Sequence, residues 1–304
     1  MKNSLVIMVG APGSGKDTLI KELMKGTENT CVVSSDDMRV ELFGFEDQAR
    51  NGELFQAMNA RVKELAKTHA RVYYNATNLN RKRRVALCNE MKKHFTTIEV
   101  IACICPIEEL LDRNKTRAER HIPEDKIVQL IKSIQLPLIS EWDYNECLYF
   151  YTGTQREDRR NTRIIDLKDY DQNNPHHNET LGDHIVRTAE ACSDNTLAFE
   201  AALSHDIGKP FCREEDVKGI SHYKGHNLVS AYMYMTDCLN MFSVIALDKW
   251  HNDVIALIEF HDHIFNFKHD VEAMKNAYNK KYDGLDEKFW AAFKMLTDAD
   301  RLRP

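Results

Sequence analysis

The stretch GAPGSGKDT at residues 10–18 has the composition of a phosphate-binding loop, and it directly follows the apolar run LVIMV. Glycines let the backbone fold tightly, so that successive N–H groups point at phosphate oxygens, and a helix that starts there adds its positive N-terminal end. Lys16 supplies a point charge for the β and γ phosphates of a nucleotide. We therefore expect this loop to bind ATP or another NTP, together with Mg²⁺. The expected contacts are Gly10, Gly13, Ser14, Gly15, Lys16, Asp17 and Thr18.

The residue after Lys16 departs from the usual form of such a loop. Ser or Thr normally has this place, where its hydroxyl reaches Mg²⁺, whereas here Asp17 comes first and Thr18 second. A carboxylate is a charged oxygen ligand that suits Mg²⁺ or a water bound to it. The alternative is that Asp17 points away and Thr18 acts instead, as in the GKxT loops of adenylate-kinase-like enzymes. The sequence leaves both roles open.

Two adjacent carboxylates and an arginine follow the next β-rich run, in SSDDMRVEL at residues 34–42. A kinase needs a base that accepts the proton of the attacking hydroxyl, and a cation that holds the acceptor. Asp36 and Arg39 fit these two roles. Asp37 is placed to interact with the start of its own helix. The alternative interpretation is that both acids only cap this helix.

A third charged segment, LLDRNKTRAERHIPED, carries Arg113, Arg117 and Arg120 at spacings of four and three. Residues at these spacings share one face of a helix. Arginines on such a segment can close over a phosphoryl group during its transfer and neutralise its charge. We expect Arg113 and Arg117 to take part in catalysis in this way, and the alternative is an ordinary solvated helix face.

Histidines gather in the second half of the chain, where ten of the 13 follow residue 175. Histidine is the commonest metal ligand in proteins, so this distribution favours a metal site in that half. The motif SHDIGKP places His205 and Asp206 side by side on a predicted helix. His184 upstream and either Asp298 or Asp300 near the end of the chain are the candidates that complete the ligand set.

The two halves also differ in their predicted secondary structure. Short β-rich runs alternate with helical patterns up to residue 152, which indicates a parallel sheet with helices on both faces. Ligands of such sheets bind at the carboxyl ends of the strands, and the glycine-rich loop, residues 34–39 and residues 75–80 all fall there. Long helical patterns dominate after residue 175 and predict an all-α bundle. We expect a kinase domain over 1–152, a linker over 153–175 and a helical domain over 176–304.

The first half resembles the phage-type polynucleotide 5′-kinase family. The resemblance rests on the GxPGSGK loop, the D-D-x-R run that ends at Arg39, the T-N-L-N run at 77–80 and the R-N-x-x-R segment that starts at Arg113. It implies that Asp36 is the general base, that Arg39 holds the phosphate of the acceptor nucleotide, and that Arg113 and Arg117 contact the ATP phosphates. Ala76 stands where the family often has Asp, and this difference and Asp17 weaken the transfer of metal and acceptor details.

The second half resembles the HD phosphohydrolase superfamily, in its H…HD…D order and in HDIGK and DADRL. The resemblance implies a helical bundle that binds a divalent metal ion, and it favours Asp300 over Asp298 as the last ligand. It also implies that His226 and His261 bind a second metal ion or the phosphate, and that Lys209 meets a phosphate oxygen. Mixed nitrogen and oxygen ligands suit Mn²⁺, Ni²⁺, Co²⁺, Fe²⁺, Zn²⁺ or Mg²⁺. The segment is also similar to the HD domain of tRNA nucleotidyltransferases, which acts on 2′,3′-cyclic phosphates and 2′-phosphates.

Composition limits the class of protein further. The net charge of −6 excludes a uniformly basic nucleic-acid-binding surface, so contacts with DNA or RNA need a local patch. The basic runs at 81–84 and 156–163 either hold strand phosphates or form solvated faces. No apolar run is long enough for a membrane span or signal peptide. The eight cysteines form no CxxC pair, which indicates reduced thiols. We expect a soluble, cytoplasmic protein that does not bind to a membrane.

The two resemblances together imply a bifunctional enzyme that heals nucleic-acid ends, most readily those of RNA. It would phosphorylate 5′-OH ends with ATP and remove 2′,3′-cyclic, 2′ or 3′ phosphates with the help of a metal ion. Its partners would be RNA or DNA ends and an RNA ligase that acts downstream. The alternative is a nucleoside or small-metabolite kinase fused to a nucleotide phosphohydrolase, or to an HD module that only senses nucleotides.

Overall fold

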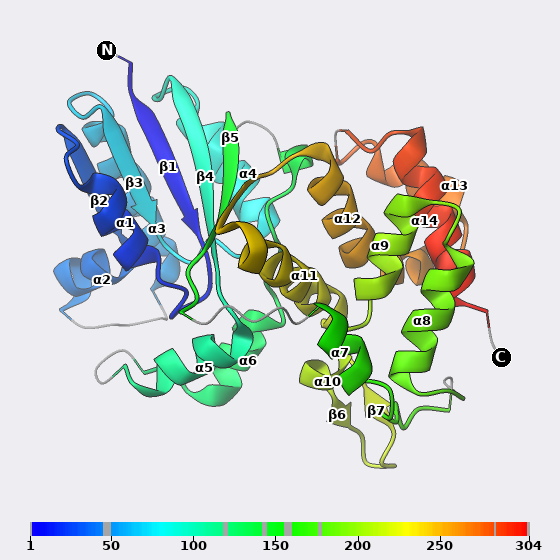
Figure 1. Ribbon diagram of the computed structural model, residues 1–304. Helices are drawn as coiled ribbons and strands as arrows, with labels where there is room; N and C mark the ends of the chain where they lie inside the picture. Colours follow the sequence, from blue (N-terminus) through cyan, green and yellow to red (C-terminus); the bar gives the residue numbers. More distant parts are fainter. Residues whose placement is uncertain are drawn as a thin grey trace. The chain divides into compact units, whose positions relative to one another are not determined.

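The computed structural model of the chain describes residues 2–44, 50–117, 121–141, 145–154, 160–175, 178–282 and 284–302. The chain forms two compact units, whose elements are labelled in Figure 1. The first, here called the sheet unit, comprises Met1–Pro123, Glu141–Gly153 and Val244–Ala246. The second, here called the helical unit, comprises Glu124–Ser140, Thr154–Ser243 and Leu247–Pro304.

The sheet unit contains a six-stranded sheet in the order β2-β3-β1-β4-β5-β8. The strands are β1 (Ser4–Val9), β2 (Thr30–Ser34), β3 (Arg71–Asn75), β4 (Thr97–Ile104), β5 (Glu146–Tyr151) and β8 (Val244–Ala246). The first five strands pair in parallel, and β8 pairs antiparallel to β5. The parallel pairing was expected from the sequence. β8 was not, because its three residues are too few to show a strand pattern.

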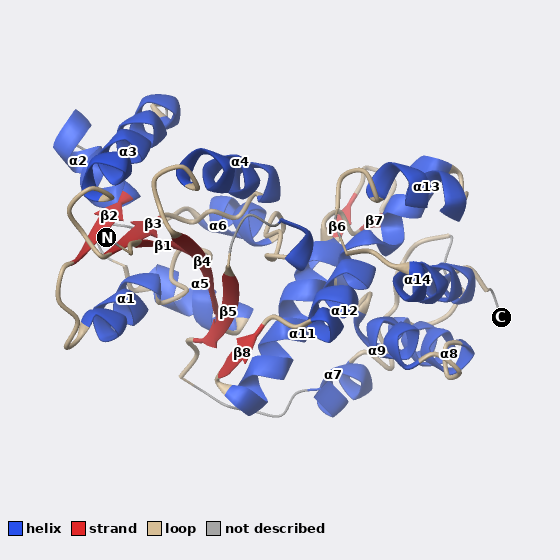
Figure 2. Ribbon diagram, turned by 90° about the horizontal axis from the view of Figure 1, so that it is seen from above, coloured by secondary structure: helices blue, strands red, loops and turns tan. Residues whose placement is uncertain are grey.

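Helices cover both faces of this sheet, as the sequence predicts. In Figure 2, α3 (Asn51–Leu65) and α4 (Arg81–Met91) lie on one face, and α1 (Lys16–Met24) and α5 (Ile107–Lys115) lie on the other. The helix α2 (Ser35–Phe43) follows β2. Because β1 is central and covered on both sides, every residue from Leu5 to Val9 is at most 1% exposed. A continuous apolar run is therefore favoured over an alternating one at this strand.

The helical unit consists largely of helices, which also agrees with the expected fold class. Its helices are α6 (Glu124–Ile131), α7 (Arg160–Asp166), α8 (Leu181–Ala191), α9 (Thr196–Ser204), α10 (Lys209–Cys212), α11 (His226–Phe242), α12 (Lys249–Phe260), α13 (Val271–Tyr278) and α14 (Glu287–Asp300). The 3₁₀ segments η1 (Ile139–Glu141) and η2 (His261–Phe267) follow α6 and α12. The strands β6 (Glu214–Glu215) and β7 (Ser221–His222) form a small hairpin that the all-α expectation lacked. No helix among the described residues combines the length and apolar character needed to cross a bilayer.

Capping side chains fix where the helices of this unit begin. The side chains of Thr180, Asn195, Asp248 and Asp286 each accept a backbone N–H from the first turn of α8, α9, α12 and α14. Such caps satisfy N–H groups that have no partner inside the helix. They set the register of the helices, and through it the direction in which each candidate ligand points.

The two units interleave along the chain. Residues 124–140 belong to the helical unit although they lie within the predicted kinase domain, and 244–246 belong to the sheet unit although they lie within the predicted helical domain. The backbone N–H of Leu136 donates to Glu259 Oε1 at 3.0 Å, and that of Ile139 donates to Asn252 Oδ1 at 2.6 Å. These bonds join sequence positions more than 100 residues apart, which local sequence patterns do not reveal.

A buried ion cluster fixes the start of α4. Glu141 Oε1 accepts from Arg81 Nε at 2.9 Å and from Arg84 Nη2 at 2.6 Å, and its Oε2 accepts from Arg84 Nε at 2.8 Å. The side chains of Arg84 and Glu141 are at most 1% exposed. Arg81 and Arg84 share the inner face of the helix, whereas Lys82 and Arg83 are exposed. Half of the basic run at 81–84 is therefore structural, and the idea that the whole run holds strand phosphates is wrong for these two arginines.

We expect Glu141→Gln to destabilise the protein by about 3–5 kcal/mol, because it leaves two buried guanidinium groups without their counter-charge. Urea unfolding followed by far-UV circular dichroism measures this change. The matched control is Glu22→Gln, which removes the same charge from an exposed pair with Lys25 and should cost at most about 1 kcal/mol. Equal unfolding curves for the two variants would show that the buried cluster does not hold α4 in place.

Candidate active sites

The glycine-rich loop joins β1 to α1 and has the geometry of a P-loop. Gly15 caps α1 in the left-handed conformation, with φ of 80°. A Cβ atom at Gly10 would lie 2.4 Å from Ser14 Oγ and 3.0 Å from the carbonyl oxygen of Cys103, so only glycine fits there. Ser14 Oγ is buried and has no hydrogen-bond partner among the described residues. The loop thus closes tightly at the carboxyl end of β1, where ligands of parallel sheets bind.

Lys16 lies inside this loop. Its Nζ donates to the carbonyl oxygens of Gly10 at 2.9 Å and Ala11 at 3.0 Å. Burial lowers the pKa of Lys16, and the carboxylates of Asp17 and Asp36 oppose that shift. The loop therefore gathers one ammonium group and two carboxylates at the same edge of the sheet.

Asp17 points toward β3. Asn75, the last residue of β3, donates from Nδ2 to Asp17 Oδ1 at 2.6 Å. Asn75 is 8% exposed, whereas Asp17 and Thr18 are both exposed. Asn75 begins the 75–80 stretch that the sequence places at this edge, but it was given no role there.

Asp36 and Arg39 lie on α2, directly after β2. Ser34 caps this helix by accepting the N–H of Asp37, so Asp36 and Asp37 both lie in its first turn. Arg39 is 5% exposed and donates from Nη2 to Asn51 Oδ1 at 2.6 Å. Its Nε and Nη1 are buried and have no hydrogen-bond partner among the described residues. An arginine with unused donors at this edge is suited to an anionic group.

Arg113 on α5 contacts the P-loop directly. Its Nη1 donates to the carbonyl oxygen of Gly13 at 3.1 Å, and its Nη2 donates to that of Thr152 at 2.7 Å and to Glu109 Oε1 at 2.5 Å. Arg117 lies near enough for its charge to lower the pKa of Lys16. The structure thus brings Arg113 into contact with the loop and Arg117 near Lys16, while Arg120 lies outside the described residues.

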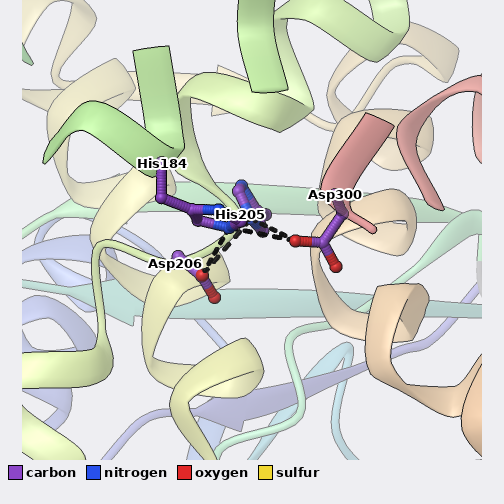
Figure 3. A group of neighbouring side chains, drawn as sticks. All are labelled: His184, His205, Asp206 and Asp300. Carbon is purple, nitrogen blue, oxygen red and sulfur yellow. Dashed lines mark hydrogen bonds and ion pairs between the residues drawn. The ribbon is translucent and has the colours of Figure 1, made fainter. Parts of the chain in front are cut away.

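A second group of chemically active side chains gathers inside the helical unit, as Figure 3 shows. His184 comes from the first turn of α8, His205 and Asp206 follow α9, and Asp300 ends α14. His184 Nε2 lies 3.2 Å from His205 Nε2, 3.3 Å from Asp206 Oδ2 and 3.0 Å from Asp300 Oδ1. One ligand atom from each of the four residues lies within 4.8 Å of the others, a spacing that suits a single metal ion.

The other oxygen of Asp206 belongs to a second group. His226 Nε2 lies 3.0 Å and His261 Nε2 lies 3.8 Å from Asp206 Oδ1, and the two nitrogens are 3.4 Å apart. Asp262, which the sequence analysis did not single out, lies 3.3 Å from each of these nitrogens. It follows His261 directly in the chain, which is the signal that could have found it. Asp206 thus connects two adjacent sets of ligands.

The hydrogen bonds behind the rings support metal binding. The Nδ1 atoms of His205, His226 and His261 lie 2.7, 2.8 and 2.7 Å from the carbonyl oxygens of residues 202, 223 and 258. A carbonyl oxygen only accepts, so Nδ1 carries the proton, and Nε2 of a neutral ring presents a lone pair. Asp206 Oδ1 is buried with no hydrogen-bond donor among the described residues. With neutral rings, this arrangement of Nε2 atoms and carboxylate oxygens suits a bound cation.

Electrostatics lead to the same requirement. Burial alone would lower the pKa of His205, but the carboxylates of Asp206 and Asp300 raise it to about 10. Burial would likewise raise the pKa of Asp206, yet His205 and Lys209 hold it well below its usual range. The two buried carboxylates thus favour positive charge beside them, which protonated histidines and Lys209 supply here and which a divalent cation could also supply.

Three further side chains hold these ligands in place. Lys209 Nζ donates to Asp206 Oδ2 at 2.6 Å and to Gln172 Oε1 at 2.9 Å, so it is buried against the cluster rather than exposed. Glu179 Oε1 lies 3.2 Å from His184 Nδ1 and accepts from Arg187 Nη2 at 2.6 Å. Arg187 Nη1 also donates to the carbonyl oxygen of Ala299, next to Asp300. Arg187 thus links Glu179, which contacts His184, to the backbone beside Asp300.

The glycine of HDIGK has a packing role at this site. A Cβ atom at Gly208 would lie 2.6 Å from the carbonyl oxygen of His226 and 2.7 Å from the N atom of Ser230. The N–H of Gly208 donates to Ser230 Oγ at 2.9 Å. The loop after Asp206 can therefore lie directly on the first turn of α11, which carries His226.

Other candidates lie apart from the cluster. Asp298 is exposed and pairs with Lys294 at 2.5 Å, so Asp300, and not Asp298, lies in the group of side chains that could hold a metal ion. His222 pairs with Asp216 on the surface hairpin, and His251 pairs with the helix cap Asp248. His176 and His177 lie outside the described residues.

Comparisons with known proteins identify the N-terminal part of the chain. Residues 5–137 match the family model AAA_33, an AAA domain. The strand–loop–helix geometry around Lys16 agrees with this match, and the N-terminal part is a parallel α/β sheet with a P-loop. A comparison with curated proteins gives no match.

Several solved structures resemble parts of the chain. Two structures of the Pnkp1/Rnl/Hen1 complex, one of them described as an RNA repair complex, match at 26% identity with TM-scores of 0.35 and 0.40. These matches cover 41% and 43% of this chain and 42% and 44% of the other chains, so this chain spans less than half of their length. Chaetomium thermophilum Kti12 with ADP-AlF3 matches at 18% identity and a TM-score of 0.39, over 53% of this chain and 95% of that one.

We expect Asp300→Asn to weaken Mn²⁺ binding by about 10–100-fold or more at one site, because it removes a charged ligand from the first group. Asp206→Asn should weaken binding at both groups, because both share that carboxylate. Isothermal titration with Mn²⁺ after removal of all metal measures these affinities.

Asp298→Asn is the matched control for this titration. It removes the same charge from a residue two positions before Asp300, where the carboxylate forms an exposed pair with Lys294. It should bind Mn²⁺ as the wild type does. If the variants of Asp300 and Asp298 bind Mn²⁺ equally well, Asp300 is not a ligand.

Proposed function

We propose that this chain is a bifunctional enzyme that heals RNA ends. One site phosphorylates 5′-OH ends with ATP, and the other removes 2′,3′-cyclic, 2′ or 3′ phosphates with a divalent metal ion. The proposal is supported by two separate sets of side chains in one chain that are suited to phosphate chemistry. These are the P-loop with Asp36 and Arg39, and the histidine–aspartate cluster around Asp206.

In the kinase reaction, the P-loop backbone and Lys16 hold the phosphates of ATP. Asp36 accepts the proton of the attacking 5′-hydroxyl, and Arg39 binds a phosphate of the acceptor strand with the donors that are not used by Asn51. Arg113 and Arg117 offset the charge that develops on the phosphoryl group during transfer. The contact between Arg113 and Gly13 supports this role, since it brings the guanidinium to the loop.

In the phosphohydrolase reaction, His184, His205, Asp206 and Asp300 would hold one divalent cation, and Asp206, His226 and His261 are suited to a second. Such a cation would lower the pKa of a water molecule that attacks phosphorus. Lys209 keeps the shared carboxylate of Asp206 ionised and oriented, and its ammonium group adds positive charge beside the incoming phosphate. The proposed metals are Mn²⁺, Ni²⁺, Co²⁺, Fe²⁺ or Zn²⁺.

The two reactions belong together chemically. A broken RNA strand often ends in a 5′-OH and a 2′,3′-cyclic phosphate, whereas a ligase needs a 5′-phosphate and a 3′-OH. An enzyme with both activities produces both ligatable ends, so an RNA ligase is the partner class that would use its product. We propose that both reactions take place in the cytoplasm.

One observation favours the alternative, a kinase for nucleosides or small metabolites fused to a nucleotide phosphohydrolase. The burial of Arg81 and Arg84 against Glu141 removes two cations from the surface of a chain with a net charge of −6. A small acceptor needs no extended basic surface, whereas an RNA strand does. The acceptor that is used fastest therefore decides between the two functions.

The test follows both ends of a short RNA with a 5′-OH and a 2′,3′-cyclic phosphate, in the presence of ATP, Mg²⁺ and Mn²⁺, by mass spectrometry. The wild type should gain a 5′-phosphate and lose the cyclic phosphate. Lys16→Ala should slow only the first change, and Asp206→Asn only the second. Each should lose about 10²–10³-fold in rate, the usual loss for one group that stabilises charge in the transition state.

The same assay with a DNA strand, a free nucleoside and a 3′-nucleotide compares the acceptors. Asp298→Asn should keep both activities and serves as the control for handling and metal content. Faster phosphorylation of the nucleoside than of the RNA would favour the small-molecule kinase. Loss of the cyclic phosphate at an unchanged rate in Asp206→Asn would exclude the cluster as the phosphohydrolase site.

A further inference from the structure

Asp17 occupies the place of the usual P-loop hydroxyl and is held in a defined position. Asn75 is buried at the end of β3 and donates to Asp17 Oδ1 at 2.6 Å, while Asp17 itself remains exposed on the first turn of α1. The carboxylate is therefore fixed at the loop by a neighbour from another element, instead of moving freely in solvent. This argues against a role in which Asp17 simply points away from the nucleotide.

Negative charge lies beside the positive charge of Lys16 and Arg117 at the loop. Asp17 and Asp36 both lie close enough to Lys16 to raise the pKa of its ammonium group, against the effect of burial. The guanidinium of Arg113 is already paired with Glu109 at 2.5 Å. Metal-free nucleotide brings several more negative charges, and like charges at short range repel strongly away from bulk water.

We propose that Asp17 makes nucleotide binding at this P-loop conditional on a divalent cation. Its carboxylate repels the phosphates of metal-free ATP or ADP, and it attracts the cation of the metal complex, directly or through a bound water. A neutral hydroxyl in the same place would gain from Mg²⁺ without repelling the free nucleotide. Asn75 is the positioning residue, because its donor keeps the carboxylate at the loop.

This inference concerns the donor site alone. It rests on the P-loop geometry and on nucleotide binding there, and it holds whether the acceptor is an RNA end or a small molecule. Its thermodynamic content is a coupling free energy between nucleotide and cation, which equilibrium binding measures without any turnover.

The experiment measures the Kd of ADP for the full chain by isothermal titration, once in EDTA and once in saturating Mg²⁺. For the wild type, the Kd in EDTA should be at least about 100-fold higher than the Kd in Mg²⁺, a difference in binding free energy of about 2.7 kcal/mol. In Asp17→Asn the carboxylate becomes a neutral amide of the same shape, which can still accept from Asn75. This variant should bind ADP at least about tenfold more tightly in EDTA, and its ratio of the two Kd values should fall toward that of an ordinary P-loop.

Three further variants keep the result specific. Asp17→Ser restores the usual hydroxyl and should behave like Asp17→Asn. Asn75→Ala releases the carboxylate, so the ratio of the two Kd values should fall by a smaller factor. Glu22→Gln removes one exposed charge from the same helix and should leave both Kd values unchanged.

Two results would overturn the proposal. If Asp17→Asn binds ADP in EDTA no more tightly than the wild type, the carboxylate does not repel the free nucleotide. If Glu22→Gln changes the ratio as much as Asp17→Asn does, the effect reflects overall charge and not the position of Asp17. Failure of the RNA end-healing assay alone would leave this inference intact, since ADP binding needs no acceptor.

Discussion

The Asp206 carboxylate is 2% exposed, and a buried charge costs several kcal/mol unless neighbouring groups neutralise it. The helical unit meets this cost from all sides, because Lys209 contacts one oxygen and four histidines from separate segments surround both. The caps that start α8 and α12, and the close approach at Gly208, bring those histidines to one carboxylate. The same convergence that neutralises the charge produces a set of metal ligands.

The electrostatic requirement of the sheet unit differs, because a P-loop binds an anionic ligand whereas the helical unit neutralises its own buried carboxylate. Backbone N–H groups, Lys16 and the arginines at the carboxyl edge provide the positive side, and Asp17 and Asp36 provide a negative counterpart beside them. A site of mixed charge distinguishes between charge states of a ligand better than a uniformly positive one, because the wrong state meets repulsion. Both candidate sites thus rest on the placement of opposite charges and not on a high net charge of the protein.

Much of this arrangement follows from local sequence signals. The glycine-rich loop between an apolar run and a helical pattern fixed the position of Lys16, and the alternation of runs predicted the parallel sheet with helices on both faces. HDIGK and the distant DADRL brought together His205, Asp206 and Asp300, although they are almost 100 residues apart. The features that escaped prediction depend on tertiary contacts. The sequence around Arg81 and Arg84 predicts a basic surface, but both side chains are buried and paired with Glu141. Residues 244–246 form a strand because they pair with the edge of β5.

The interleaving of the two units has a consequence for how the chain is made. Leu136 hydrogen-bonds to Glu259, which is synthesised 123 residues later. At typical elongation rates of about 5–20 residues per second, the segment around α6 waits roughly 6–25 seconds for its partner helix. Four apolar side chains of this segment are fully buried in the folded protein: Ile127, Ile131, Leu136 and Leu138. During that interval they are exposed as an apolar stretch on the nascent chain. Nascent-chain chaperones are therefore expected to engage this protein at α6, and the order of translation becomes part of its folding pathway.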